Sequence, residues 1–186
     1  EELEDEDNEA KTLQPQFDPL LEENSDVVGW IKIDDTRIDY PIVQSDNNEE
    51  YLTKGFNKED NIAGSIFMDY RNNIEKLDRN TVIYGHRMKD GTMFKDLTKF
   101  KNKKFFNEHK TFQIDTLYQS YEAEIFSFYT TTTEFNYIQT DFSSDEEFEQ
   151  FLKQIEHNSY CYRDVNIEAT DTIVTLSTCD YELDEL

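Results

Sequence analysis

The sequence predicts a single, mostly β domain that also contains several helices. Short segments rich in β-branched and aromatic residues alternate with turn residues along most of the chain. A length of 186 residues suffices for one domain with a full core, and 14 Phe and 11 Tyr offset the low apolar content of 36%. No internal repeat divides the chain, so we expect one domain.

The N-terminal residues predict little order. Residues 1–9 are mostly acidic, and we therefore expect residues 1–12 to form a disordered leader ahead of one domain at 13–186. Residues 17–24, in which Pro19 precedes two leucines, predict a short helix.

Two short strands are predicted next, at residues 27–33 and 37–43, with an acidic turn at 34–36 between them. Pro41 has no backbone N–H to donate to a neighbouring strand. We therefore expect the second strand to lie at a sheet edge or to contain a bulge.

Capping residues indicate where two helices begin. Ser45 or Asp46 precedes a helix at 46–52, and Ser144 with Glu147 forms a capping box ahead of an amphipathic helix. The other expected elements are strands at 64–68 and 81–86, short helices at 92–99 and 102–107, and strands at 111–114, 120–131 and 172–179.

Charge and composition limit the partners. The net charge of −24 argues against nucleic acid and anionic lipid. No run of about 18 apolar residues occurs, so we do not expect this chain to span a membrane. The acidic leader lacks the alternating oxygen ligands and turn glycine of a calcium loop, and we expect no metal and no cofactor.

Two predicted strands end in residues that together could perform nucleophilic catalysis. The strand at 172–179 ends on Cys179, and the strand at 81–86 ends on His86. A thiol becomes a good nucleophile only when a neighbour stabilises its thiolate, which is a common role of histidine. The alternative is that the cysteine is a small buried apolar residue and the histidine a surface or capping residue. The other cysteine, Cys161, is expected to be structural, with both thiols free.

Three separated segments resemble the sortases, the cysteine transpeptidases of Gram-positive cell surfaces. Residues 175–179, Thr-Leu-Ser-Thr-Cys, match the Thr-Leu-x-Thr-Cys signature of that family. Residues 84–94, Tyr-Gly-His-Arg-Met-Lys-Asp-Gly-Thr-Met-Phe, closely resemble the histidine segment of the class B branch. Residues 63–72, Ala-Gly-Ser-Ile-Phe-Met-Asp-Tyr-Arg-Asn, resemble the same branch. The resemblance extends over most of the chain from about Val28 onward.

The resemblance implies an antiparallel β-barrel with N-terminal and peripheral helices, and an acyl-transfer activity. Cys179 would attack the threonine carbonyl of a sorting-motif peptide, and His86 would protonate the leaving amine. A cell-wall amine, on a peptidoglycan cross-bridge or precursor, would then resolve the thioester. A hydrolytic cysteine peptidase and a non-catalytic peptide-binding module on the same scaffold are the alternatives.

Four further residues are implied as substrate contacts. Tyr84 and Ser177 precede the histidine and the cysteine by two positions, so they share a strand face with them. Asn48 and Leu52 match an asparagine and a leucine that contact the sorting peptide in class B enzymes. For Leu52, plain core packing is an equally good interpretation.

The resemblance also implies features that the sequence does not contain. Sortases carry an arginine on a closing strand after the cysteine, yet no arginine follows Cys179. We expect this chain to end before that strand, and we assign the catalytic role to none of the alternatives, Arg71, Arg87 and Arg163. Class B enzymes also have an N-terminal membrane anchor, which is absent here, so the expected location is the extracellular face of the cell membrane.

Overall fold

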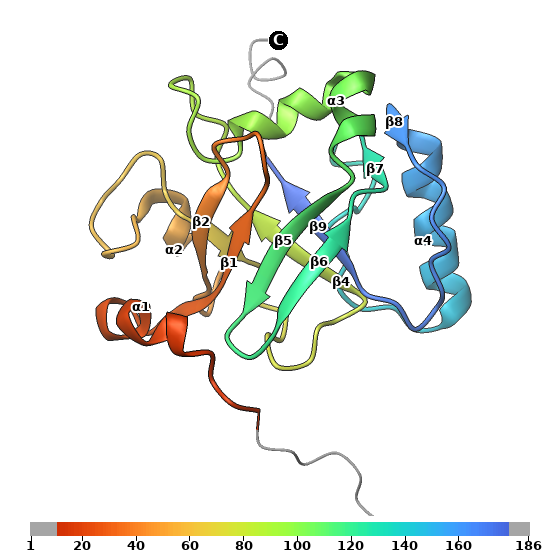
Figure 1. Cartoon of the computed structure of the whole chain (residues 1–186). Coiled ribbons are helices and arrows are strands. Elements are labelled where there is room, and N and C mark those ends of the chain that lie inside the picture. The colour runs from red at the N-terminus through yellow and green to blue at the C-terminus, as the bar shows by residue number, and fades with distance from the viewer. Residues whose placement is uncertain (1–10, 179–186) are drawn as a thin grey trace, which may run out of the picture.

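The structure, a computed structural model, describes residues 11–178. Within that range a seven-stranded sheet curls into a nearly closed barrel, and helices surround it (Figure 1). The predicted acidic leader lies almost wholly outside the described residues. The helical elements are η1 (Pro15–Phe17), α1 (Asp18–Glu23), α2 (Glu50–Thr53), η2 (Lys95–Lys101), α3 (Lys103–Glu108) and α4 (Asp145–Asn158).

The strands form one large sheet and one small one. The large sheet has the order β6-β5-β1-β2-β3-β4-β9, and β7 pairs with β8 in the small one. Most neighbours are antiparallel, as predicted, but β2–β3 and β4–β9 are parallel. The strands are β1 (Val27–Lys32), β2 (Asp39–Val43), β3 (Ile66–Met68), β4 (Asn80–Tyr84), β5 (Thr111–Thr116), β6 (Ser120–Glu124), β7 (Ser127–Phe128), β8 (Cys161–Tyr162) and β9 (Ile173–Ser177).

Of the two outcomes predicted for the Pro41 strand, an edge position is wrong, and the irregularity in its pairing with β1 is a register shift on the β1 side, between Val27 and Gly29. Strand β2 lies inside the sheet, between β1 and β3. Pro41 faces Trp30 of β1, but the pairing of β2 with β3 involves only Ile42 and Val43. Proline therefore has a neighbour on one side only, which is why an interior strand tolerates its missing N–H.

Two other predicted elements differ in their bounds. Helix α2 begins at Glu50 rather than 46, because the Asn47 side chain accepts from the backbone N–H groups of Glu49 and Glu50. The strand predicted over 120–131 breaks into β6 and β7, which belong to different sheets. Neither Ser45 nor Asp46 caps the helix.

Helix α4 confirms the predicted cap with one change. The hydroxyl of Ser144 accepts from the N–H of Glu147, as expected. The Glu147 carboxylate accepts from the N–H and hydroxyl of Ser143 rather than from Ser144. The helix stands beside β7 and β8 (Figure 1). Its buried face packs against the start of β9, in a cluster formed by Phe135, Phe148, Phe151, Ile155 and Ile173.

Two further apolar clusters hold the sheet and its N-terminal helices. The larger contains fully buried residues of the sheet, among them Ile31, Ile42 and Ile83. The other joins Phe17 to Tyr51 and to the sheet. The predicted structural cysteine, Cys161, is a buried free thiol in β8. Within residues 11–178, no helix is both long and apolar enough to cross a membrane.

Candidate active site

The parallel pairing of β4 with β9 organises the candidate site. Tyr84 pairs with Ser177, and the N–H of Gly85 donates to the Ser177 carbonyl at 3.1 Å. Because the two strands are parallel neighbours, their C-terminal ends lie side by side. His86 follows β4 by two positions, and Cys179 lies just outside the described residues.

The His86 ring is held by a backbone carbonyl. Its Nε2 atom lies 2.7 Å from the carbonyl oxygen of Leu52 in α2. Because a carbonyl can only accept, Nε2 carries the hydrogen, and Nδ1 is the nitrogen left for chemistry. The Leu52 side chain is 39% exposed, so the core-packing interpretation of this residue is wrong.

Asn48 and Tyr84, two predicted contacts from distant segments, meet at one buried carboxylate. Oδ2 of Asp69 accepts from Nδ2 of Asn48 at 3.0 Å and from the Tyr84 hydroxyl at 2.7 Å. The Arg71 guanidinium donates to both carboxylate oxygens, through Nε at 2.8 Å and Nη2 at 2.7 Å.

This arrangement shifts the pKa values of the groups involved. Burial alone would raise the pKa of Asp69, but hydrogen bonds from Arg71, Tyr84 and Asn48 outweigh burial and lower it to about 2. Burial, and then the bond to Asp69, raises the pKa of Tyr84. Asp69 is therefore ionised and Tyr84 neutral at physiological pH.

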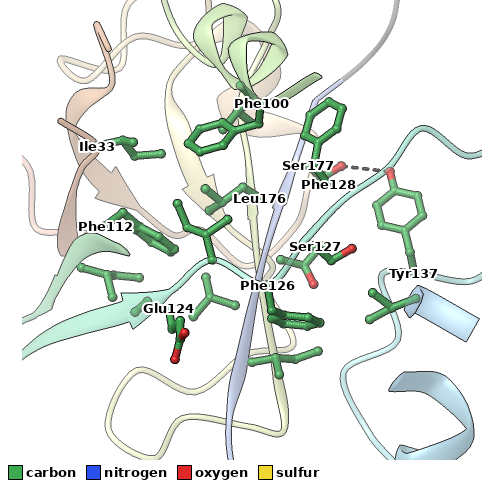
Figure 2. A pocket seen from close by; sticks show the side chains of 18 of the residues that line it. Ile33, Phe100, Phe112, Glu124, Phe126, Ser127, Phe128, Tyr137, Leu176 and Ser177 are labelled. Atoms are coloured by element: carbon green, nitrogen blue, oxygen red, sulfur yellow. Dashed lines mark hydrogen bonds between the residues drawn. The ribbon is translucent and has the colours of Figure 1, made fainter. Parts of the chain in front are cut away.

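Ser177, the fourth predicted contact, is buried and hydrogen-bonded to the loop ahead of α4. Its hydroxyl lies 2.9 Å from the Tyr137 hydroxyl (Figure 2). Asn80 of β4 donates to the carbonyls of Tyr137 and Gln139, at 3.2 and 2.8 Å. The loop is thus bound to both strands whose ends form the site.

The candidate arginines lie in different surroundings. Arg71 binds Asp69 and the Ile138 carbonyl. Arg163 donates to the carbonyls of Ile125 and Phe106 and stacks over the Phe106 ring. Arg87 lines a cavity that is also lined by the two outer strands of the sheet, β6 and β9. The catalytic arginine stays unassigned.

Comparison with known proteins decides the family. A family model described as a sortase domain matches residues 31–185. The chain belongs to the sortase family. Its relatives place it in the class B branch, as the motifs predicted.

Two curated relatives are sortase B proteins. The chain is 50% identical over 161 residues to sortase B of Listeria monocytogenes, covering 87% of this chain and 65% of the relative. It is 43% identical over 168 residues to sortase B of Staphylococcus aureus, covering 90% and 69%. The chain therefore spans about two thirds of the length of these relatives, slightly less in the Listeria protein.

Solved sortase B structures confirm the fold. Sortase B from Bacillus anthracis in complex with AAEK1 superposes with a TM-score of 0.87 at 50% identity, covering 92% of this chain and 80% of the other. The Staphylococcus aureus sortase B–substrate complex gives a TM-score of 0.87 at 42% identity, covering 91% and 79%.

The described part of this sortase leaves its barrel open along one side. Strands β6 and β9 are the outer strands of the sheet, and both line a cavity of about 1050 Å³ (Figure 2). The expectation that the chain ends before the closing strand concerns residues outside the described range, so it stays a prediction. Aromatic side chains gather in the cavity, among them Phe100, Phe112, Phe126 and Phe128.

Sequence reasoning missed two residues of this site. Asp69 falls in the class B-like segment at 63–72 directly after β3, so its position beside family-like residues was a usable signal. Tyr137 lies in a loop without any recognised motif, and no sequence signal pointed to it.

Proposed function

We propose that this sortase is a cysteine transpeptidase that cleaves a sorting-motif peptide after threonine and transfers the acyl group to a cell-wall amine. The observation that carries the proposal is the parallel pairing of β4 with β9. This pairing places Tyr84 opposite Ser177. The proposed base, His86, lies two positions after Tyr84, and the proposed nucleophile, Cys179, lies two positions after Ser177. Such an enzyme would anchor surface proteins at the extracellular face of the membrane.

The proposed reaction has two halves. The Cys179 thiolate attacks the threonine carbonyl, the peptide C–N bond breaks, and Nδ1 of His86 protonates the leaving amine. A thioester remains. The acceptor amine then attacks it, gives its proton to His86 and releases the thiolate. The Leu52 carbonyl supports this cycle, because it holds Nε2 and leaves Nδ1 for both proton transfers.

The partners follow from the same chemistry. Transfer to an amine instead of water requires a positioned acceptor, because water is far more abundant. One solved relative is described as a sortase B–substrate complex, and another as sortase B complexed with triglycine. These descriptions support a peptide and an amine as the partners of this chain.

Class B sortases read either Asn-Pro-x-Thr-Asn-like or Pro-x-Thr-Gly-like sorting signals, and the resemblance does not choose between them. The test is therefore turnover of two quenched peptides, one containing Asn-Pro-Ala-Thr-Asn and the other Leu-Pro-Ala-Thr-Gly, with triglycine as acceptor. We expect Cys179→Ala and His86→Ala each to lower transfer by at least about a thousandfold, since both groups act in the bond-breaking step. His157→Ala, at an exposed position on α4, should retain normal turnover. Near-normal transfer by Cys179→Ala or His86→Ala would refute the assignment.

Two measurements separate the alternatives. A hydrolytic peptidase would release only free acid, whereas a transpeptidase forms a ligated product that mass spectrometry detects. A binding module has no reason to contain a reactive thiol. Iodoacetamide should therefore label Cys179 in the native protein and spare the buried Cys161.

A further inference from the structure

The carboxylate of Asp69 joins two segments of the chain that carry proposed substrate contacts, Asn48 and Tyr84. The side chain is fully buried, directly after β3. It binds Asn48 from the segment before α2 and Tyr84 from the end of β4. Its partner Arg71 also donates to the Ile138 carbonyl at 2.9 Å, in the loop that carries Tyr137.

The donors and acceptors in this cluster have only one consistent assignment. An ionised carboxylate can only accept, so the Tyr84 hydroxyl must use its hydrogen on Asp69. Asn48 turns Nδ2 to Asp69, and its Oδ1 accepts from the N–H of Tyr70 at 3.0 Å. Both ends of the amide are therefore fixed, and the amide cannot flip without placing an oxygen against the carboxylate.

We propose that Asp69 is a positioning residue of the substrate site, which fixes both the rotamers and the hydrogen-bonding polarity of Asn48 and Tyr84. Tyr84 then presents only an acceptor to its ligand, so it selects a peptide N–H rather than a carbonyl or carboxylate. Asn48 keeps one N–H and one acceptor site, which fit a peptide amide. This inference rests on the proposed function, because it assumes that these two residues face the substrate.

The kinetic test replaces Asp69 by its neutral isostere. Asp69→Asn can donate as well as accept, so Tyr84 and Asn48 lose their unique arrangement. We expect the KM for the quenched peptide to rise about tenfold, the worth of one hydrogen bond to a charged group, while kcat stays within about twofold. Asp60→Asn is the matched control, because this carboxylate is 91% exposed and binds only Lys54 among the described residues.

A triple variant, compared with the double variant from which it is made, separates positioning from a general loss of stability. If Asp69 acts through Tyr84 and Asn48, adding Asp69→Asn to a protein that already contains Tyr84→Phe and Asn48→Ala should raise the KM only slightly further. Additive effects, an unchanged KM, or a fall in kcat alone would overturn the inference.

A third readout does not depend on turnover. In the free protein, the side-chain amide resonances of Asn48, assigned with Asn48→Ala, should shift in Asp69→Asn and stay in place in Asp60→Asn. Unmoved resonances would also overturn the inference. If the unmodified protein transfers neither peptide to triglycine, the proposed function fails, and the spectra still decide whether Asp69 orders this cluster.

Discussion

At the scale of single residues, backbone groups shape the site as much as the side chains do. The carbonyl of Leu52 selects the tautomer of His86, and Gly64 lies behind that carbonyl. Gly64 has φ +59°, in the left-handed region that L side chains rarely adopt. A Cβ at Gly64 would meet the carbonyl oxygens of Tyr51 at 2.5 Å and Leu52 at 2.7 Å.

We therefore predict that Gly64→Ala impairs both stability and the site. The left-handed φ alone costs about 1–2 kcal/mol, and the two close contacts add to that cost. Urea unfolding measures the loss of stability, and peptide turnover should fall because the carbonyl that holds His86 must move. Gly55→Ala is the control, since its Cβ would contact side chains of Asn61 and Asn57 no closer than 3.2 Å. Equal behaviour of the two variants would contradict this prediction.

At the scale of secondary-structure elements, α4 is stabilised both by local interactions at its N-terminus and by tertiary packing of its apolar face. Three acidic residues occupy its first turn, where they complement the helix dipole. The Ser144 hydroxyl satisfies one free N–H at this end. The apolar face then buries Phe148, Phe151 and Ile155 against neighbouring aromatic residues.

Removal of the cap should therefore be measurable in the whole protein. We predict that Ser144→Ala lowers the free energy of unfolding by about 1 kcal/mol, because the N–H of Glu147 loses its acceptor. Urea unfolding followed by circular dichroism gives the value. Lys153→Ala, on the exposed side of the same helix, should change the stability by less than about 0.5 kcal/mol. A loss as large in the control would mean that the cap is not the cause.

At the scale of the whole molecule, charge opposes compactness. The chain contains 42 acidic and 18 basic residues, which gives the net charge of −24. Described ion pairs offset this excess only locally, and several join exposed side chains, such as Lys54 with Asp60. Mutual repulsion among carboxylates therefore destabilises the folded state.

Salt should screen this repulsion. We predict that raising sodium chloride from about 0.02 to 0.2 M stabilises the protein by on the order of 1 kcal/mol, or roughly 2–4 °C in melting temperature. Potassium chloride should act identically, since screening depends on ionic strength. A melting temperature that stays constant or falls as salt is added would show that charge repulsion does not significantly lower the stability of the folded state.

The sequence by itself determined the local elements and the family. Alternating apolar residues marked most strands, and Ser144 marked the start of α4, because these signals act within a few residues of the chain. The segment at 175–179 indicated the sortase family, and the segments at 63–72 and 84–94 indicated its class B branch. His86 and Cys179 were candidates on their residue types and neighbours alone.

Only the tertiary structure decided which of these elements meet. Nothing near Pro41 indicated that β2 lies inside the sheet, and nothing near Asp69 indicated that Asn48 and Tyr84 converge on it. The parallel pairing of β4 with β9 joins segments about ninety residues apart and so depends on how the whole core packs. A strand's own residues specify that it pairs, whereas its partner and register depend on the buried faces of all the others.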